Sequence, residues 1–251
     1  NRLGGAGIHN GALASKTLWE LSRDFSRTTL TDRGFCVHSC TIEYQDVVRV
    51  VEEAVSEREQ QLIKQVGHYS EVAKSNFQFI QGSARLEDAH TIHIDLNDGG
   101  ERSITTDNII LAMGSRPRKL DSIPIDEKTI VTSDGLHNMD HFPESMVVLG
   151  AGVIGCEYAT MFAAFNQTKV YVIDRANRIL PFEDEDVAMV AARNLEKAGV
   201  VIHKETNLES MTIEDGRVKY VLCEKDGRCT THHVEKALVS IGRVPNTENT
   251  G

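Results

Sequence analysis

Met146–Asp174, with the sequence MVVLGAGVIGCEYATMFAAFNQTKVYVID, is the stretch that decides how the rest of this chain is interpreted. It contains an apolar run, a glycine-rich turn, an alanine-rich helical pattern and a second β-branched run that ends in an acid. The turn carries the pattern G-x-G-x-x-G, at Gly150, Gly152 and Gly155. This order of features predicts a strand–turn–helix–strand unit of a parallel α/β sheet.

The three glycines and the terminal acid suit a dinucleotide. Gly150 allows a tight turn, Gly152 lets a pyrophosphate approach the main chain, and Gly155 lets the helix pack closely on the strand. Asp174 lies nineteen residues after Gly155 and can accept hydrogen bonds from both hydroxyls of an adenosine ribose. We therefore predict a dinucleotide site; a glycine turn in another kind of α/β protein is the alternative.

The residues around these positions bear on which dinucleotide is bound. Val153 and Ile154 begin the helix, whose free N–H groups and positive dipole end would face the phosphates. Asp174 favours NAD, because a carboxylate repels the 2′-phosphate of NADP. Arg175 and Arg178 leave NADP open, because an arginine can bind that phosphate.

Composition excludes several classes of function. The 251 residues suffice for one large domain or two smaller ones, and 40% hydrophobic with 25% charged residues is ordinary for a soluble globular protein. A net charge of −10 without a basic run argues against nucleic acid and anionic membrane surfaces as partners. Because no long apolar run and no signal peptide are visible, we expect a cytoplasmic protein without a membrane span.

The cysteines and histidines give no pattern of a metal site. The five cysteines are scattered and odd in number, which fits a reducing compartment better than a disulfide framework. Cys36, His38 and Cys40 lack a second ligand pair, so no metal site is predicted there or elsewhere. His232 and His233 would point to opposite faces of a strand, and both are interpreted as surface residues.

The first part of the chain contains glycines, long helical patterns and short strands. Gly4–Lys16, GGAGIHNGALASK, is either a mobile loop or a loop pressed against a cofactor. A helix from about Ser15 to Asp24 precedes a surface loop over 25–34, and apolar residues at helical spacing predict one long helix over Gln45–Lys74. Short strands are predicted over 77–86, 91–96 and 103–112.

The second part contains the βαβ unit and its continuation. The proline-containing segment Arg116–Glu144 is interpreted as a crossover between domains. After Asp174 we expect a helix over Glu183–Ala198 and a third parallel strand over Val200–His203. Strands over 208–213, 217–223, 229–234 and 237–241 would then form an antiparallel meander.

Four stretches, in this order, together resemble the flavoprotein pyridine nucleotide–disulfide oxidoreductases, the family of dihydrolipoamide dehydrogenase and soluble transhydrogenase. They are Gly4–Lys16, Leu111–Pro117 (LAMGSRP), Val147–Glu157 (VVLGAGVIGCE) and Val239–Thr247 (VSIGRVPNT). The resemblance implies a Rossmann-like α/β fold that binds FAD and NAD(P). It divides the chain into a partial FAD-binding domain over 1–118, a complete NAD(P)-binding domain over 119–242, and a return to the FAD domain over 243–251.

The resemblance also assigns roles to residues. In such enzymes hydride passes from the nicotinamide to the flavin, and Lys16 would lie near the flavin ring, paired with Glu157. An ordinary salt bridge between domains is the alternative for this pair. Leu208 and Gly242 would contribute main chain to the nicotinamide dinucleotide. The residues that would line FAD are Gly4, Gly5, Ala84, Gly114 and Ser115.

The chain departs from the family in three respects. Gly7 and Ala12 occupy the positions of the redox-active cysteines, so no disulfide can be reduced by the usual route. With His9, this stretch is similar to the corresponding loop of the transhydrogenases, which also lacks the full dithiol. Met113 stands where the family's flavin motif usually has threonine. The first FAD-binding glycine motif and the C-terminal dimer domain are missing, so the chain is interpreted as a fragment.

The function expected of the intact protein is that of an FAD-dependent NAD(P)H oxidoreductase. Without the dithiol, its electrons would pass to a quinone or a second nicotinamide, and the full-length protein would be a homodimer. One alternative is a non-catalytic NAD-binding module or an inactive family member. Another is a disulfide reductase that uses Cys36 and Cys40, although their spacing differs from that of the family's dithiol.

Overall fold

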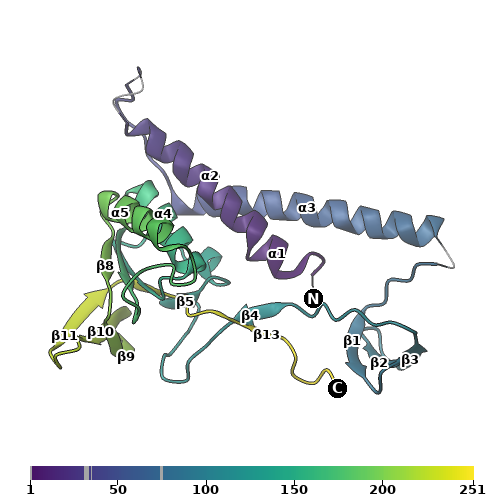
Figure 1. The fold of residues 1–251 in the computed structure, drawn as a ribbon. Helices are drawn as coiled ribbons and strands as arrows, with labels where there is room; N and C mark the ends of the chain where they lie inside the picture. The colour runs from purple at the N-terminus through teal and green to yellow at the C-terminus, as the bar shows by residue number, and fades with distance from the viewer. Residues whose placement is uncertain (1, 31–33, 35, 74–75) are drawn as a thin grey trace.

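The computed structural model describes residues 2–30, 34, 36–73 and 76–251 (Figure 1). The helices are α1 (Gly5–His9), α2 (Ala12–Thr28), α3 (Tyr44–Val72), the 3₁₀ helix η1 (Leu136–Asn138), α4 (Val153–Phe165) and α5 (Glu185–Lys197). The first strands are β1 (Gly82–Leu86), β2 (Thr91–Leu96), β3 (Glu101–Thr105), β4 (Ser115–Pro117), β5 (Ile130–Thr132), β6 (Ser145–Leu149) and β7 (Lys169–Ile173). The remaining strands are β8 (Val201–His203), β9 (Asn207–Glu214), β10 (Arg217–Cys223), β11 (Cys229–Val234), β12 (Lys236–Val239) and β13 (Arg243–Pro245).

A parallel sheet of five strands, in the order β5-β12-β6-β7-β8, organises the second half of the chain. All four strand pairs in it are parallel, as expected for strands joined by crossover connections. Strand β12 is the last of these five strands in sequence, yet it lies between the first two, β5 and β6. A separate antiparallel sheet, β11-β10-β9, contains three of the four strands predicted for the meander. The fourth, predicted over 237–241, is wrong as a meander strand, because it is β12 and pairs in parallel with β5 and β6.

The two faces of β6 bury different layers, because successive side chains of a strand point to opposite sides. Met146 and Val148 belong to a cluster that contains the α4 residue Phe162. Val147 and Leu149 belong to a second cluster, which contains Tyr220 of the meander and other residues of β9–β11. The parallel sheet is therefore covered by helices on one face and by the antiparallel sheet on the other.

Helices α2 and α3 join the helical layer. Leu18 of α2 and Tyr44 of α3 belong to the same buried cluster as Phe162. The Tyr44 hydroxyl also donates a hydrogen bond of 2.8 Å to the Leu136 carbonyl oxygen. Figure 1 shows α2 crossing α3, while the far half of α3 extends away from the α/β unit toward the sheet β1-β2-β3. No helix of the described residues is both long and apolar enough to cross a bilayer.

The expectation of a loop over Gly4–Lys16 is wrong, because α1 and the first turn of α2 occupy this stretch. Alanine and leucine favour the helix here, and burial of Leu18 and Phe25 on one side of α2 holds it against α4. The loop predicted over 25–34 is helical as far as Thr28, and its residues 31–33 lie outside the described residues. The long helix predicted from Gln45 is confirmed as α3, although residue 74 lies outside the described ones.

Several predicted strands are present with different bounds, whereas β4, β5 and β13 were not predicted. The prediction over 91–96 coincides with β2, but the strand predicted over 77–86 begins only at Gly82. The strand predicted over 103–112 ends at Thr105 as β3, because no strand of the described residues pairs with residues 106–112. β9–β11 and α5 match their predicted positions to within two residues at each end.

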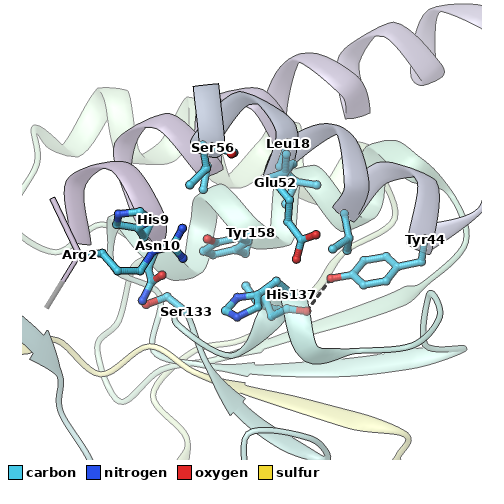
Figure 2. Close-up of a pocket in the computed structure, with 15 residues that line it drawn as sticks. Arg2, His9, Asn10, Leu18, Tyr44, Glu52, Ser56, Ser133, His137 and Tyr158 are labelled. Carbon is cyan, nitrogen blue, oxygen red and sulfur yellow. Dashed lines mark hydrogen bonds between the residues drawn. The ribbon is translucent and has the colours of Figure 1, made fainter. Parts of the chain in front are cut away.

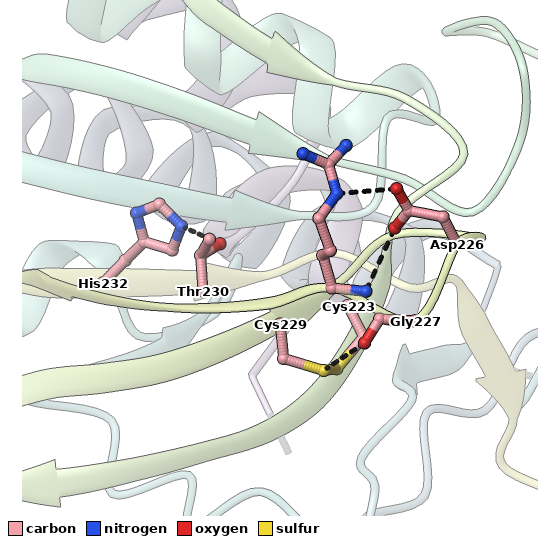
Figure 3. Close-up of a disulfide and its surroundings, with 7 residues drawn as sticks. Cys223, Asp226, Gly227, Cys229, Thr230 and His232 are labelled. Atoms are coloured by element: carbon pink, nitrogen blue, oxygen red, sulfur yellow. Dashed lines mark hydrogen bonds and ion pairs between the residues drawn. A yellow bond between two sulfur atoms is a disulfide. The ribbon is translucent and has the colours of Figure 1, made fainter.

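Two of the scattered cysteines form a disulfide that the sequence did not indicate. Cys223 and Cys229 are direct partners across β10 and β11, with their Cα atoms 4.1 Å apart (Figure 3). The hairpin around Asp226-Gly227 brings them together, which a count of cysteines does not reveal. On the same hairpin His233 is exposed, but His232 is half-buried and stacks on Tyr220 at 5.1 Å between ring centroids, so its interpretation as a surface residue is wrong.

The turn between β6 and α4 brings main chains unusually close. Gly150 has φ +101°, and a Cβ there would lie 2.6 Å from the Ser240 carbonyl oxygen. A Cβ on Gly155 would overlap the Gly150 carbonyl oxygen and lie 2.7 Å from Ser240 Oγ. Gly152 is different, because a Cβ added there meets nothing within 4 Å.

We expect thiol titration to distinguish the three kinds of cysteine. Cys36 and Cys40 are exposed, whereas Cys156 is buried, and burial raises the pKa of its thiol to about 11. At pH 8 Ellman's reagent should therefore detect two thiols in the native protein and three after unfolding without reductant. Five thiols in the unfolded protein before reduction would show that Cys223 and Cys229 are not bonded.

We expect Gly155→Ala to destabilise the chain, by at least about 2 kcal/mol, because overpacked sites cost roughly 1–3 kcal/mol. Its methyl group would displace either the Gly150 carbonyl or Ser240. The matched control is Gly152→Ser, which has open space for its side chain and a residue type that suits a helix N-cap. Urea unfolding measures both, and equal stability of the two variants would contradict the close packing described here.

Candidate functional site

A groove of about 850 Å³ lies at the carboxyl ends of β6, β7 and β12, where open parallel sheets bind their ligands. Leu149, Ile173 and Ser240 mark these three strand ends in its wall. Of the positions proposed for the nicotinamide dinucleotide, all but Gly155 line it: Gly150, Gly152, Val153, Ile154, Asp174, Leu208 and Gly242. The structure thus gathers in one groove residues that lie as far as 92 positions apart, from Gly150 to Gly242.

The N-terminus of α4 opens into this groove. Its N-cap is Gly152, and no side chain caps the first turn. The first amides of a helix have no acceptors within the helix, and they carry the positive end of its dipole. Because Val153 and Ile154 also line the groove, these amides are placed to bind an anion such as a pyrophosphate.

Asp174 follows the end of β7, lines the groove and is held in place by main-chain amides. Its Oδ2 accepts a hydrogen bond of 2.6 Å from Ala151 N, and its Oδ1 accepts one of 2.8 Å from Ala176 N. Each carboxylate oxygen has further lone-pair capacity for a hydroxyl donor. The acid therefore has two functions in this geometry: it ties the turn to the end of β7, and it offers acceptors to the groove.

The two arginines after Asp174 differ in their surroundings. Arg178 donates hydrogen bonds to the carbonyl oxygens of Pro181 and Glu183, which hold the loop before α5. Arg175 lines the groove, and no side-chain partner of it is found among the described residues. Of the two residues that could bind a 2′-phosphate, only Arg175 is therefore placed and free to do so.

The sequence did not indicate several residues of the groove. Phe182 is 99% exposed on its rim, and Arg118, Thr206 and Ser240 lie in its wall. Ser240 falls within Val239–Thr247, and that stretch could have indicated it. Phe182 follows Pro181 in an irregular loop, where no periodicity or motif marks it.

The predicted pair between Lys16 and Glu157 is present. Lys16 Nζ lies 2.8 Å from Glu157 Oε1, and the side chains are 62% and 32% exposed. The contact brings the first turns of α2 and α4 together across 141 positions of sequence. An ion pair this exposed contributes at most about 1 kcal/mol to the stability of the fold. A contribution this small does not explain why the two residues are paired.

The residues proposed to line FAD are not gathered in the same way. Gly4 and Gly5 begin α1, Ala84 lies on β1, and Gly114 and Ser115 lie at β4, beside β13. Ser115 Oγ accepts a hydrogen bond from Arg243 Nε. None of the five lines the groove. The Lys16–Glu157 pair and these five residues therefore do not share a described cavity.

The positions of the missing dithiol lie at the start of the helical layer. Gly7 is in α1 and Ala12 is the first residue of α2, and neither side chain can form a thiolate. His9, between them, is held by a contact of 2.9 Å between Nε2 and the Leu3 carbonyl oxygen. Cys36 and Cys40 are free and exposed in the connection between α2 and α3.

A second cavity of about 350 Å³ lies between α2, α3, α4 and η1 (Figure 2). Leu18, Tyr44 and Tyr158 form part of its apolar wall, with Glu52 and His137 beside them. Burial raises the pKa of the Tyr158 phenol to about 12, so it stays protonated near neutral pH. None of the residues predicted for cofactor binding lines this cavity, and it shares no lining residue with the groove.

Comparison with known proteins identifies the family. Residues 5–250 match the model of the family described as pyridine nucleotide-disulphide oxidoreductase. Dihydrolipoamide dehydrogenase from Chaetomium thermophilum is 31% identical over 254 aligned residues, which cover 99% of this chain and 49% of that protein. Soluble pyridine nucleotide transhydrogenase from Serratia proteamaculans is 29% identical, over 100% of this chain and 52% of that protein.

Solved structures agree with the fold. LpdA from Mycobacterium tuberculosis superposes with a TM-score of 0.84 at 26% identity, over 100% of this chain and 53% of that one. The chain thus spans about half the length of the relatives that it matches. The predicted α/β, Rossmann-like fold is confirmed, and the family binds FAD and NAD(P)H, as the resemblance implied. The chain belongs to the pyridine nucleotide-disulphide oxidoreductase family.

Proposed function

We propose that the intact protein is an FAD-dependent NAD(P)H oxidoreductase that passes electrons to an acceptor other than a dithiol, such as a quinone or a second nicotinamide. The observation that carries the proposal is the groove at the sheet's carboxyl edge. There an uncapped helix N-terminus, an unobstructed Gly152 and the Asp174 carboxylate face the same space. These three groups match a pyrophosphate and a ribose in the order found in a dinucleotide.

Each group of the groove has a distinct task in this proposal. The first amides of α4 bind the pyrophosphate, and Gly152 keeps the approach to them open. Asp174 accepts hydrogen bonds from the ribose hydroxyls while it anchors the glycine turn. Leu208 and Gly242 form the wall toward the nicotinamide. Arg175 can offset the repulsion between Asp174 and a 2′-phosphate, so the site can accept NADPH as well as NADH.

The pair of Lys16 and Glu157 is proposed to serve the flavin end. Bound FAD supplies a ring that takes up hydride from a nicotinamide. The Lys16 ammonium would favour negative charge near that ring, and Glu157 would hold the ammonium in place at 2.8 Å. The remaining FAD contacts from Gly4, Gly5, Ala84, Gly114 and Ser115 stay a prediction, as do the domain boundaries at 118 and 242, the cytoplasmic location and a homodimer of the full-length protein.

The choice of acceptor follows from the side chains at the dithiol positions. A dithiol relay needs a thiolate to attack a disulfide, and Gly7 and Ala12 provide none. The Cys223–Cys229 disulfide lies on the meander hairpin, and neither of its residues lines the groove. We therefore propose that electrons leave the flavin directly to a soluble acceptor.

One observation favours a second function, that of a nucleotide-binding module without catalysis. The groove for the nicotinamide dinucleotide is assembled, whereas the FAD candidates lie on separate elements without a common cavity. Such a module would bind NADH and carry no flavin. The colour of the purified protein distinguishes the two functions, because only bound flavin absorbs in the visible range.

Gly152→Val should abolish tight NADH binding, with a dissociation constant raised at least about tenfold, because its side chain would occupy the path of the pyrophosphate. The fold should persist, since a Cβ at this position meets nothing. Gly67→Val is the control: Gly67 also has open space, but it lies in α3, away from the groove. Calorimetric titration measures binding, and unchanged affinity in Gly152→Val would refute the assigned site.

For the flavin-loaded intact protein we expect NADH to bleach the flavin absorbance and a quinone to restore it with turnover. Lipoamide and glutathione disulfide should not be turned over, because no thiolate is present at positions 7 and 12. Stopped-flow spectroscopy and steady-state assays provide the measurements. Rapid reduction of either disulfide would contradict the proposed acceptor, and a colourless protein that binds NADH would favour the module.

A further inference from the structure

The sheet β1-β2-β3 carries a cluster of ionisable side chains on one face. His93 and Asp95 are two residues apart on β2 and therefore point to the same side. Across the strand pair, His93 lies opposite Ser103, and Asp95 lies opposite Glu101 of β3. Glu87 follows the end of β1 and reaches the same histidine. None of these residues lines the groove or the second cavity.

His93 lies at the centre of this cluster, with its side chain only 10% exposed. Its Nε2 lies 3.3 Å from Asp95 Oδ1 and 3.6 Å from Glu101 Oε2. Its Nδ1 lies 3.3 Å from Ser103 Oγ and 3.6 Å from Glu87 Oε1. One ring nitrogen thus faces two carboxylates, and the other faces a hydroxyl and a third carboxylate.

The pairing of Asp95 with Glu101 is unfavourable without a cation. Like charges directly opposite each other on neighbouring strands repel, because their side chains lie side by side. Among the described residues, the only ion-pair partner of either acid is His93. The nearby arginines do not neutralise them: Arg85 lies 3.7 Å from Glu87, and Arg102 donates to Gln78.

The distances suit a small divalent ion. Zinc binds histidine nitrogen and carboxylate oxygen at about 2.0–2.2 Å in a tetrahedron, which puts neighbouring ligand atoms roughly 3.3–3.5 Å apart. The separations of 3.3 and 3.6 Å from Nε2 to the two carboxylates fall at this spacing, and all three ligand atoms lie within 4.8 Å of one another. Asp95 and Glu101 have exposed side chains, so they can adjust and leave a fourth position to water.

The second ring nitrogen is placed as in a histidine that binds metal. Such a histidine donates its other N–H to an oxygen, which fixes the tautomer and leaves the facing nitrogen free to coordinate. Ser103 Oγ and Glu87 Oε1 are the oxygens in range of Nδ1. The ring is thereby oriented with Nε2 toward Asp95 and Glu101.

We propose that His93 Nε2, Asp95 and Glu101 bind a divalent transition metal of the zinc class and so fasten β2 to β3. The sequence indicated no metal site, because the three ligands are joined only by strand register. A proton on His93 Nε2 competes with the metal, because an imidazolium would also neutralise the two carboxylates. The metal and the proton are mutually exclusive at Nε2, so titration distinguishes them.

The test is calorimetric titration of the chelator-treated 251-residue chain with Zn²⁺ at pH 7.5. A Cys36→Ser/Cys40→Ser background removes the exposed thiolates, which bind zinc independently. We expect one ion per chain. Asp95→Asn and Glu101→Gln should each weaken its binding at least about tenfold. Both side chains are exposed and nearly isosteric with their replacements, so the fold should be retained.

His90→Ala is the matched control, because His90 lies on the same hairpin, exposed and bonded to Thr106. It should bind Zn²⁺ as tightly as the background protein. Co²⁺ in place of Zn²⁺ should give visible d–d bands that Asp95→Asn removes, without a thiolate charge-transfer band. The proposal is overturned if no stoichiometric ion binds, if both carboxylate variants bind as tightly as His90→Ala, or if NMR shows His93 protonated at pH 7.5 in the presence of Zn²⁺.

Discussion

The close approach of three main-chain segments at the end of the parallel sheet is the constraint on which the structure depends. Gly150, Gly155 and the residues after β12 meet at distances that leave no room for a Cβ on either glycine. Ser240 Oγ donates to the carbonyl oxygens of Leu149 and Gly150, which ties β12 to the glycine turn. Helix α4 can therefore start immediately after β6 and pack directly on it, and its uncapped amides point out of the sheet edge.

The packing of the core therefore also fixes the position of the groove. Alternate side chains of β6 fill two separate hydrophobic layers, so a shift by one residue would exchange the side chains that each layer packs against. The strand ends, and with them Asp174 and Gly242, are fixed by the same register. At this edge the helix dipole and the free amides can attract an anion, and the Asp174 carboxylate offers hydrogen-bond acceptors beside them.

The helical layer connects this frame to the chemistry of the family. Helix α2 packs on α4 and brings Lys16 to Glu157, so the ammonium lies beside the start of α4. The same α2 begins at Ala12, where the family has a reactive cysteine. The proposed loss of the thiol relay therefore requires no change of fold.

The sequence by itself determined the βαβ unit, the long helix α3, three strands of the meander, and the glycine turn and Asp174 of the groove. These depend on local periodicity and on glycines whose role follows from main-chain geometry. The tertiary structure alone decided the rest. It formed α1 from a glycine-rich stretch, ended β3 where no partner strand runs, and brought Phe182 to the groove. It also paired Cys223 with Cys229 and placed His93 between carboxylates, because the partners across a hairpin are set by its strand register, which composition and a count of cysteines do not give.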